Sequence, residues 1–236
     1  MKIGSSAWKK IIVKGARELD IHVQPVQAEQ FARHASILTK WNQKINLTTI
    51  EDPVEMAIKH FLDAILPYDC IQPGSRLLDV GSGAGFPGIA LKVMIPSLQV
   101  TLVDATRKKA NFLKHVIREL GLKHIKAVHA RIEDLDQHPG DEFNVIVSRA
   151  FSDLTKFVKM SLPYLAANGQ LIAYKAKSYA GEISKRHEVA EAQGSQQYRI
   201  PSCGDFQIKT LSFKLPVLNL TRTLLLISGS GRIDGV

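Results

Sequence analysis

A glycine-rich segment at residues 79–88 carries the clearest chemical signal in the chain, and it reads Asp-Val-Gly-Ser-Gly-Ala-Gly-Phe-Pro-Gly. Gly81, Gly83 and Gly85 follow a short apolar run and precede a helical pattern. Because glycine has no Cβ atom, a turn built from these residues can be tight, and its backbone can approach a ligand closely. The segment therefore predicts a binding site for a nucleotide-like cofactor.

Two carboxylates and the end of this loop bear on which cofactor fits. Asp79 would repel a pyrophosphate, yet it suits the ammonium and sulfonium groups of S-adenosylmethionine. Pro87 removes an N–H group that a pyrophosphate would need, and Phe86 adds bulk. Asp104 ends the next predicted strand, where a carboxylate can accept hydrogen bonds from ribose hydroxyls. These features favour S-adenosylmethionine; a nicotinamide dinucleotide is the alternative, and both carboxylates could instead only cap helices or turns.

The residues at 148–153, Ser-Arg-Ala-Phe-Ser-Asp, bear on the acceptor of a methyl group. Enzymes that methylate exocyclic amines commonly carry Asn/Asp-Pro-Pro-aromatic here, and this segment lacks it. Carbon-5 methylation of a pyrimidine needs a thiolate nucleophile, and neither Cys70 nor Cys203 follows a strand near the glycine loop. A purine N7 has a lone pair and no proton to lose, so it needs no general base. The sequence is consistent with N7 methylation, and no histidine spacing indicates a metal.

The elements that must position these residues alternate between strand and helix from residue 74 onward. Strands are predicted at 76–80, 98–103, 124–129, 143–148, 170–174, 198–200 with 207–211, and 223–228. Helices are predicted at 87–94, 106–120 and 152–165, and Asn168-Gly169 is predicted to form a turn before the fifth strand. This alternation predicts an α/β fold with a doubly wound, Rossmann-like sheet of seven strands.

The first 73 residues lack a convincing strand and are predicted to form an N-terminal helical extension. Residues 28–41 place apolar side chains at spacings of three and four, which is typical of a helix packed on one face. Asp52 followed by Pro53 predicts the start of a second helix. We therefore expect an extension at 1–73 and a cofactor-binding domain at 74–236.

Composition narrows the class of protein and its partners. The chain has 236 residues, with 45% hydrophobic and 22% charged residues, which is ordinary for a globular protein. No apolar run approaches the roughly 20 residues of a membrane span, and two cysteines suit a reducing compartment, so a cytoplasmic monomer is expected. The net charge of +9 favours a polyanionic partner, although a basic protein without such a partner is the alternative.

Four motifs together resemble the RsmG family, also called glucose-inhibited division protein B. They are Trp-Asn-Gln-Lys-Ile-Asn-Leu-Thr at 41–48, His-Phe-Leu-Asp at 60–63, the glycine-rich segment, and Ser-Arg-Ala at 148–150. The resemblance runs from about residue 25 to 180. It implies a class I methyltransferase fold with an N-terminal helical extension. It also implies S-adenosylmethionine-dependent methylation of N7 of one guanosine in small-subunit (16S) ribosomal RNA.

The resemblance also implies roles for individual residues. The expected cofactor site comprises Asp79, Gly81, Gly83, Gly85, Phe86, Asp104, Ile132, Glu133 and Arg149. Of these, Ile132 and Glu133 would flank the adenine, and Arg149 would lie near both the cofactor and the target base as the catalytic residue. Asn46 and His60 lie in family motifs without an assigned role, and each could simply pack the extension. The chain departs from the family pattern at Ala64 and Ala176.

Basic residues suggest where RNA would bind. Lys175 and Lys177 follow the fifth predicted strand, on the same edge of the sheet as the glycine loop, and are expected to contact phosphates. Arg107 belongs to a basic helix that is a further candidate, although part of that helix could be an ordinary solvated face. A small-molecule methyltransferase of the same fold, or a non-catalytic module that binds RNA or the ribosome, are the alternative functions.

Overall fold

The computed structural model describes residues 1–175 except 137, 139, 150 and 152, together with 184–185, 195–200, 203–218 and 220–229. Within these residues a single sheet of nine strands runs in the order β3-β2-β1-β4-β5-β9-β8-β7-β6. The strands are β1 Arg76–Val80, β2 Gln99–Asp104, β3 Ile125–His129, β4 Phe143–Ser148, β5 Leu165–Lys175, β6 Ser184–Lys185, β7 Ser195–Ile200, β8 Gly204–Leu215 and β9 Leu220–Ser228. The strands β3-β2-β1-β4-β5-β9-β8 form the seven-stranded sheet expected from the sequence. Strand β7, which contains the predicted segment 198–200, and β6 extend this sheet.

Strands β1 to β5 are parallel, and β9 reverses the direction next to β5. Alternate residues of β1 face opposite sides of the sheet, so Leu77 and Leu78 contribute to different hydrophobic cores. Both are fully buried, as expected for a strand covered on both faces. The carboxyl ends of β1, β2 and β4 consequently meet at one edge of the sheet.

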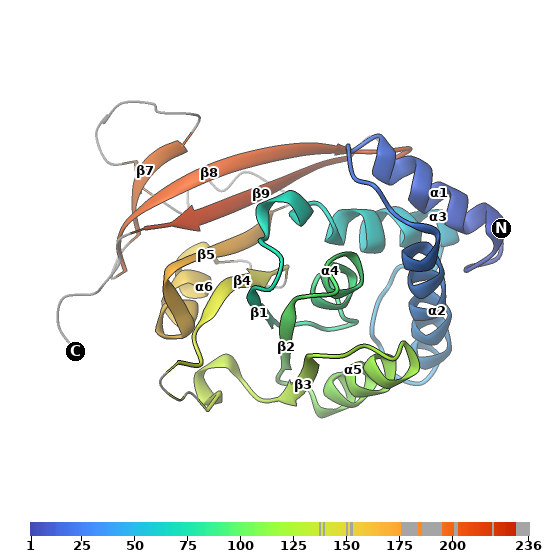
Figure 1. Cartoon of the computed structure of the whole chain (residues 1–236), viewed down its shortest axis with the longest axis horizontal. Coiled ribbons are helices and arrows are strands. Elements are labelled where there is room, and N and C mark those ends of the chain that lie inside the picture. Colours follow the sequence, from blue (N-terminus) through green and yellow to red (C-terminus); the bar gives the residue numbers. More distant parts are fainter. Residues whose placement is uncertain are drawn as a thin grey trace.

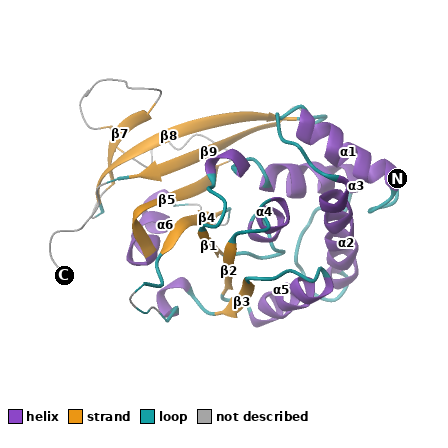
Figure 2. Cartoon of the chain, in the orientation of Figure 1, coloured by secondary structure: helices purple, strands orange, loops and turns teal. Residues whose placement is uncertain are grey.

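Helices cover the two faces of this sheet (Figures 1 and 2). The helical segments are α1 Ser6–Arg17, α2 Pro25–Asn42, α3 Pro53–Met56, the π-helix η1 Ala57–Leu62, η2 Tyr68–Cys70, α4 Gly88–Met94, α5 Arg107–Glu119, η3 Ile132–Asp134, α6 Leu154–Ser161 and η4 Leu162–Tyr164. The N-terminal helices, α4 and α5 pack on one face, and α6 packs on the other. No helix in the described part of the chain is long and apolar enough to cross a membrane.

The N-terminal helices share one hydrophobic core with the sheet. Trp8, Phe31 and Phe61 are fully buried, in the same core as Leu77 and Leu102. The Trp8 and Phe61 rings meet edge to face at 5.4 Å, a favoured geometry for aromatic pairs. The extension therefore packs as part of the body of the molecule, and the boundary at residue 73 stays a prediction.

Local signals locate several helix ends correctly, and two features differ from the expectation. The Asp52 carboxylate accepts hydrogen bonds from the next amides and caps α3, as predicted. Helix α1 was not predicted, although Trp8, Ile12 and Ala16 repeat at the spacing of a helix face. The predicted turn at Asn168-Gly169 is wrong, because a register shift between β4 and β5 absorbs the extra residues within a continuous strand.

A long hairpin formed by β8 and β9 reaches across the molecule to α1 (Figure 1). Near its tip Leu215 is buried in the core that contains the N-terminal helices. A Cβ atom on Gly15 of α1 would lie 3.0 Å from the Pro216 ring, so the hairpin and α1 are in close contact. This hairpin carries Arg222 from the C-terminal part of the chain to the N-terminal helices.

Candidate active site

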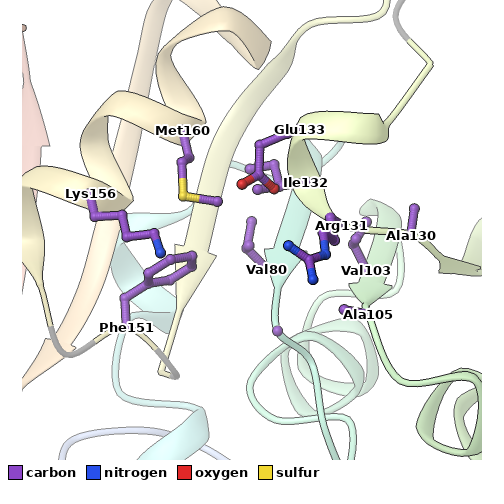
Figure 3. A pocket seen from close by; sticks show the side chains of 11 residues that line it. Val80, Val103, Ala105, Ala130, Arg131, Ile132, Glu133, Phe151, Lys156 and Met160 are labelled. Carbon is purple, nitrogen blue, oxygen red and sulfur yellow. The ribbon is translucent and has the colours of Figure 1, made fainter.

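A pocket of about 280 Å³ opens at the carboxyl ends of β1, β2 and β3 and is bordered by α6 (Figure 3). It is lined by Val80, Gly81, Val103, Ala105, Ala130, Arg131, Ile132, Glu133, Phe151, Lys156 and Met160. Most of these side chains are apolar, and the charged ones, Arg131, Glu133 and Lys156, surround them. A flat, apolar cavity with a few polar groups can hold a heteroaromatic base and fix its orientation.

The glycine loop borders this pocket. The backbone amides of Gly81 and Ser82 both donate to the carbonyl of Val103, at 2.9 and 3.1 Å, which ties the loop to β2. Gly81, Gly83 and Gly85 have φ angles of 74°, 54° and 90°. Other residues rarely adopt this left-handed region, so the backbone path itself requires glycine.

Asp79 lies beneath the loop and does not face the pocket. Its side chain is fully buried, and its Oδ2 atom accepts a hydrogen bond from the Gly88 amide at 2.9 Å, so it caps α4. The other oxygen, Oδ1, is buried with no hydrogen-bond partner among the described residues. Burial raises the pKa of Asp79 to about 7. Gly88 packs closely above Asp79, and this carboxylate is not among the residues that line the pocket, so its expected contact with a ligand stays a prediction.

Asp104 joins the glycine loop to the start of α5. Its Oδ2 atom accepts from the Gly83 amide at 3.0 Å, and its Oδ1 atom accepts from the Thr106 amide at 2.8 Å. A carboxylate has about four lone-pair sites, so each oxygen keeps capacity for a further donor. These two hydrogen bonds hold the side chain at the end of β2, and its expected contact with ribose stays a prediction.

Phe86 is enclosed between two histidines of the N-terminal helices. Its ring stacks on His34 with centroids 4.9 Å apart and on His60 with centroids 4.7 Å apart. His34 Nε2 lies 2.9 Å from the carbonyl oxygen of Ala84 in the loop. Burial lowers the pKa of His34 to about 4 and that of His60 to about 3, so both rings are neutral near pH 7. His34 therefore donates its Nε2 proton to the loop.

Arg149 follows β4 and contacts the N-terminal helices. One Nη1 atom donates to the carbonyl of Lys59 and to Asp63 Oδ2, both at 3.1 Å. The guanidinium carbon lies 5.5 Å from the centroid of the Phe86 ring, within the range of a cation–π contact. Asp63 is buried and also accepts from Arg222 Nε at 2.5 Å. One carboxylate thus holds two arginines from distant parts of the chain.

The motif at 41–48 supports His60. The Asn42 side chain donates to the carbonyl of Thr48 at 2.9 Å and accepts from the amides of Leu47 and Thr48. This fixes the loop so that Thr48 Oγ1 lies 2.8 Å from His60 Nε2. Asn46 is exposed on the same loop. The motif therefore positions His60, a function that local sequence patterns did not reveal.

Five of the predicted site residues fall into two groups. Gly81, Ile132 and Glu133 line the pocket. Phe86 and Arg149 lie against His60. Other residues of the site were not predicted from the sequence. They are the pocket residues Val80, Val103, Phe151, Lys156 and Met160, and the supporting residues His34, Asn42, Thr48, Asp63 and Arg222. Val80 and Val103 lie inside β1 and β2. Lys156 and Met160 lie inside α6, so no local pattern marked these residues as lining a pocket.

The residues predicted to bind RNA have different surroundings. Arg107 is exposed at the start of α5, two residues beyond the pocket residue Ala105. Lys175 ends β5 and is only 7% exposed. Arg107 is therefore more accessible to an RNA partner than Lys175 is. Lys177 lies outside the described residues.

The sheet order and the loop between β1 and α4 define the class I fold of S-adenosylmethionine-dependent methyltransferases. The crystal structure of a SAM dependent methyltransferase from Aquifex aeolicus has this fold, with a TM-score of 0.52 and 15% sequence identity. The superposition covers 78% of this chain and 97% of that one.

A more specific assignment comes from the sequence comparison. Residues 27–210 match the GidB family model, which describes rRNA small subunit methyltransferase G. Ribosomal RNA small subunit methyltransferase G from Geotalea uraniireducens is 42% identical over 202 residues, covering 84% of this chain and 92% of the relative. The protein of the same name from Alkaliphilus metalliredigens is 35% identical over 226 residues, covering 93% and 89%. The chain belongs to the GidB family of small-subunit rRNA methyltransferases.

Proposed function

We propose that this chain transfers the methyl group of S-adenosylmethionine to N7 of a guanine in small-subunit (16S) ribosomal RNA. The observation that carries the proposal is the match to rRNA small subunit methyltransferase G over residues 27–210, which include both groups of site residues. The net charge of +9 suits an RNA partner. We assign the chain to the cytoplasm as a monomer that acts on the small subunit or its RNA.

The residues at the pocket suit the cofactor. The apolar walls around Ile132 and Met160 can enclose the adenine, and Glu133 lies where an amine could be bound. Asp104, held by two backbone amides, has lone pairs left for the ribose hydroxyls. Asp79 Oδ1 has no hydrogen-bond partner among the described residues, so a cationic ligand bound above the loop would favour the ionised form of this carboxylate.

Methylation of guanine N7 requires little acid–base catalysis by the protein. Bound S-adenosylmethionine supplies an electrophilic methyl group on a sulfonium. Guanine N7 carries a lone pair and no proton, so the chain needs only to align it and exclude water. His34 and His60 are neutral and engaged in packing contacts, and they serve as supports for the loop. Arg149 is anchored through Nη1, and its Nη2 atom lies 3.4 Å from His60 Nδ1. We assign its remaining N–H groups to guanine O6.

Calorimetric titration with S-adenosylmethionine tests the cofactor assignment. The wild-type protein should bind, and Asp104→Ala should weaken binding at least tenfold, because it removes both a ribose acceptor and the anchor of the loop. Asp104→Asn is the matched control: it keeps one oxygen acceptor and should bind with intermediate affinity. Undetectable binding by the wild type would refute the enzymatic function, and unchanged binding by Asp104→Ala would refute the ribose assignment.

The acceptor is tested separately by adding small ribosomal subunits, naked rRNA or a mixture of small molecules. An RNA methyltransferase should modify RNA, with a rate that falls as salt rises. Transfer to small molecules alone, without dependence on salt, would identify a small-molecule methyltransferase instead.

A further inference from the structure

Helix α5 exposes a row of positive side chains on its outer face. Arg107, Lys114 and Arg118 are exposed at spacings of seven and four residues, which places them on one ridge of the helix. Lys108 is exposed beside Arg107. We call these four residues the basic ridge. The helix has five lysines and arginines and one acidic residue, whereas an ordinary solvated face mixes both signs.

The order of charges along α5 does not stabilise the helix. Arg107, Lys108 and Lys109 occupy its first turn, which contains no acidic residue. The N-terminus of a helix carries a partial positive charge, so each such cation destabilises the helix. Helix α1 has the opposite arrangement, with Lys14 and Arg17 in its last turn, where cations are favourable. Helix stability therefore does not explain the three cations in the first turn of α5.

Few acidic side chains offset the basic ridge. Among the described residues, Arg118 lies 3.7 Å from Glu119, while no ion pair involves Arg107, Lys108 or Lys114. Three cations of α5 thus lack an acidic partner within the described structure. Such a surface attracts an external polyanion.

The ridge begins at the rim of the pocket. Arg107 is two residues from the pocket residue Ala105, and from there the ridge runs roughly 16 Å along α5. The exposed side chains of Arg131 and Lys156 border the same pocket, and both project toward it (Figure 3). S-adenosylmethionine carries an ammonium, a sulfonium and a single carboxylate, so it offers only one anionic group to the cations at the rim. Phosphates of the methyl acceptor suit them better.

We propose that the basic ridge is a docking surface for the phosphodiester backbone of the RNA that flanks the target guanosine. The inference rests on the proposed function and adds the face of the molecule on which the RNA lies. The backbone follows α5 toward the pocket rim, and its phosphates meet Arg107, Lys108 and Lys114. Phosphate contacts of this kind position the nucleic acid without reading its sequence.

The test measures binding to small ribosomal subunits as salt is varied at constant magnesium. Three substitutions are combined, R107A, K108A and K114A, and the control combines K10A, K14A and R17A on α1. Each phosphate contact contributes about 0.7–0.9 to the slope of log affinity against log salt, so the ridge variant should lose about 2–3 from that slope. Between 50 and 200 mM salt the wild type should then lose roughly 20- to 40-fold more affinity than the ridge variant.

Further measurements separate this inference from the proposed function. The ridge variant should bind S-adenosylmethionine as the wild type does and unfold at the same or a higher temperature, because removing cations from the first turn relieves the dipole. An unchanged salt slope, or an equal loss in the α1 control, would overturn the ridge with the proposed function intact. Failure of the wild type to bind subunits or cofactor would overturn the proposed function, and the ridge with it.

Discussion

Asp63 links three parts of the chain, and replacing it with asparagine probes that link. Its two oxygens contact Arg149 Nη1 at 3.1 Å and Arg222 Nε at 2.5 Å. The Asp63 side chain is 1% exposed, whereas those of Arg149 and Arg222 are 22% and 20% exposed. Asp63→Asn keeps the shape of the side chain and removes its charge, so both arginines lose their counterion.

The expected cost follows from this burial. Removing one partner of a buried ion pair costs about 3–5 kcal/mol, and the part of each arginine that reaches solvent favours the lower end, about 3 kcal/mol. For a chain of 236 residues this corresponds to a drop in Tm of roughly 6–12 °C. Because Arg149 also loses its anchor, kcat should fall more than the affinity for S-adenosylmethionine.

Urea unfolding at pH 7.5, followed by circular dichroism, measures the free energies in a double-mutant cycle. Arg222→Gln should cost less than Asp63→Asn, and the double variant should cost at least 1 kcal/mol less than the sum of both, since the two residues share one contact. Glu29→Gln is the control, because the exposed pair of Lys9 and Glu29 should contribute less than 1 kcal/mol. A cost below 1 kcal/mol for Asp63→Asn, or costs that add within about 0.5 kcal/mol, would refute the reasoning.

Two further predictions concern the support of the glycine loop. Burial raises the pKa of Asp79 from 3.8 to about 7, so the native state holds a proton that the unfolded chain releases from about pH 4 upward. This contribution to stability is present below pH 4 and is lost as pH rises to about 7. The free energy of unfolding of Asp79→Asn should not show that loss. If the free energies of unfolding of the wild type and Asp79→Asn changed with pH in parallel, the raised pKa would be contradicted. His34→Phe keeps an aromatic ring beside Phe86 but removes the hydrogen bond to Ala84, worth about 1 kcal/mol, so the Kd for S-adenosylmethionine should rise about fivefold. His34→Gln restores a hydrogen-bond donor without the ring, so recovery of the wild-type affinity in this variant would show that the hydrogen bond matters and the stacking does not. An unchanged Kd in His34→Phe would contradict a role for the hydrogen bond to Ala84.

Local patterns in the sequence located the features that depend on neighbouring residues. The glycine loop, the strands around it and Asp104 follow from backbone geometry and from the alternation of strand and helix. The cap at Asp52 was equally visible, because the capping carboxylate and the amides it accepts from are adjacent in the chain.

Contacts between distant segments were beyond such patterns. Asp63 and Arg222 are 159 positions apart, and only the β8–β9 hairpin brings them together. The burial of Asp79 likewise depends on how closely Gly88 packs above it, which its own sequence neighbourhood does not indicate. The enclosure of Phe86 depends on two histidines from different helices. These tertiary contacts decide which residues face the ligand and which support the loop.

Transfer of labelled methyl groups to small ribosomal subunits tests the central claim most directly. Subunits that lack the modification are incubated with the protein and labelled S-adenosylmethionine, and the RNA is digested to nucleosides and separated. We expect the label in N7-methylguanosine, at close to one methyl group per subunit, and a large loss of transfer for Arg149→Ala. Label in any other nucleoside, or no label in a protein that binds the cofactor, would contradict methylation of guanine N7.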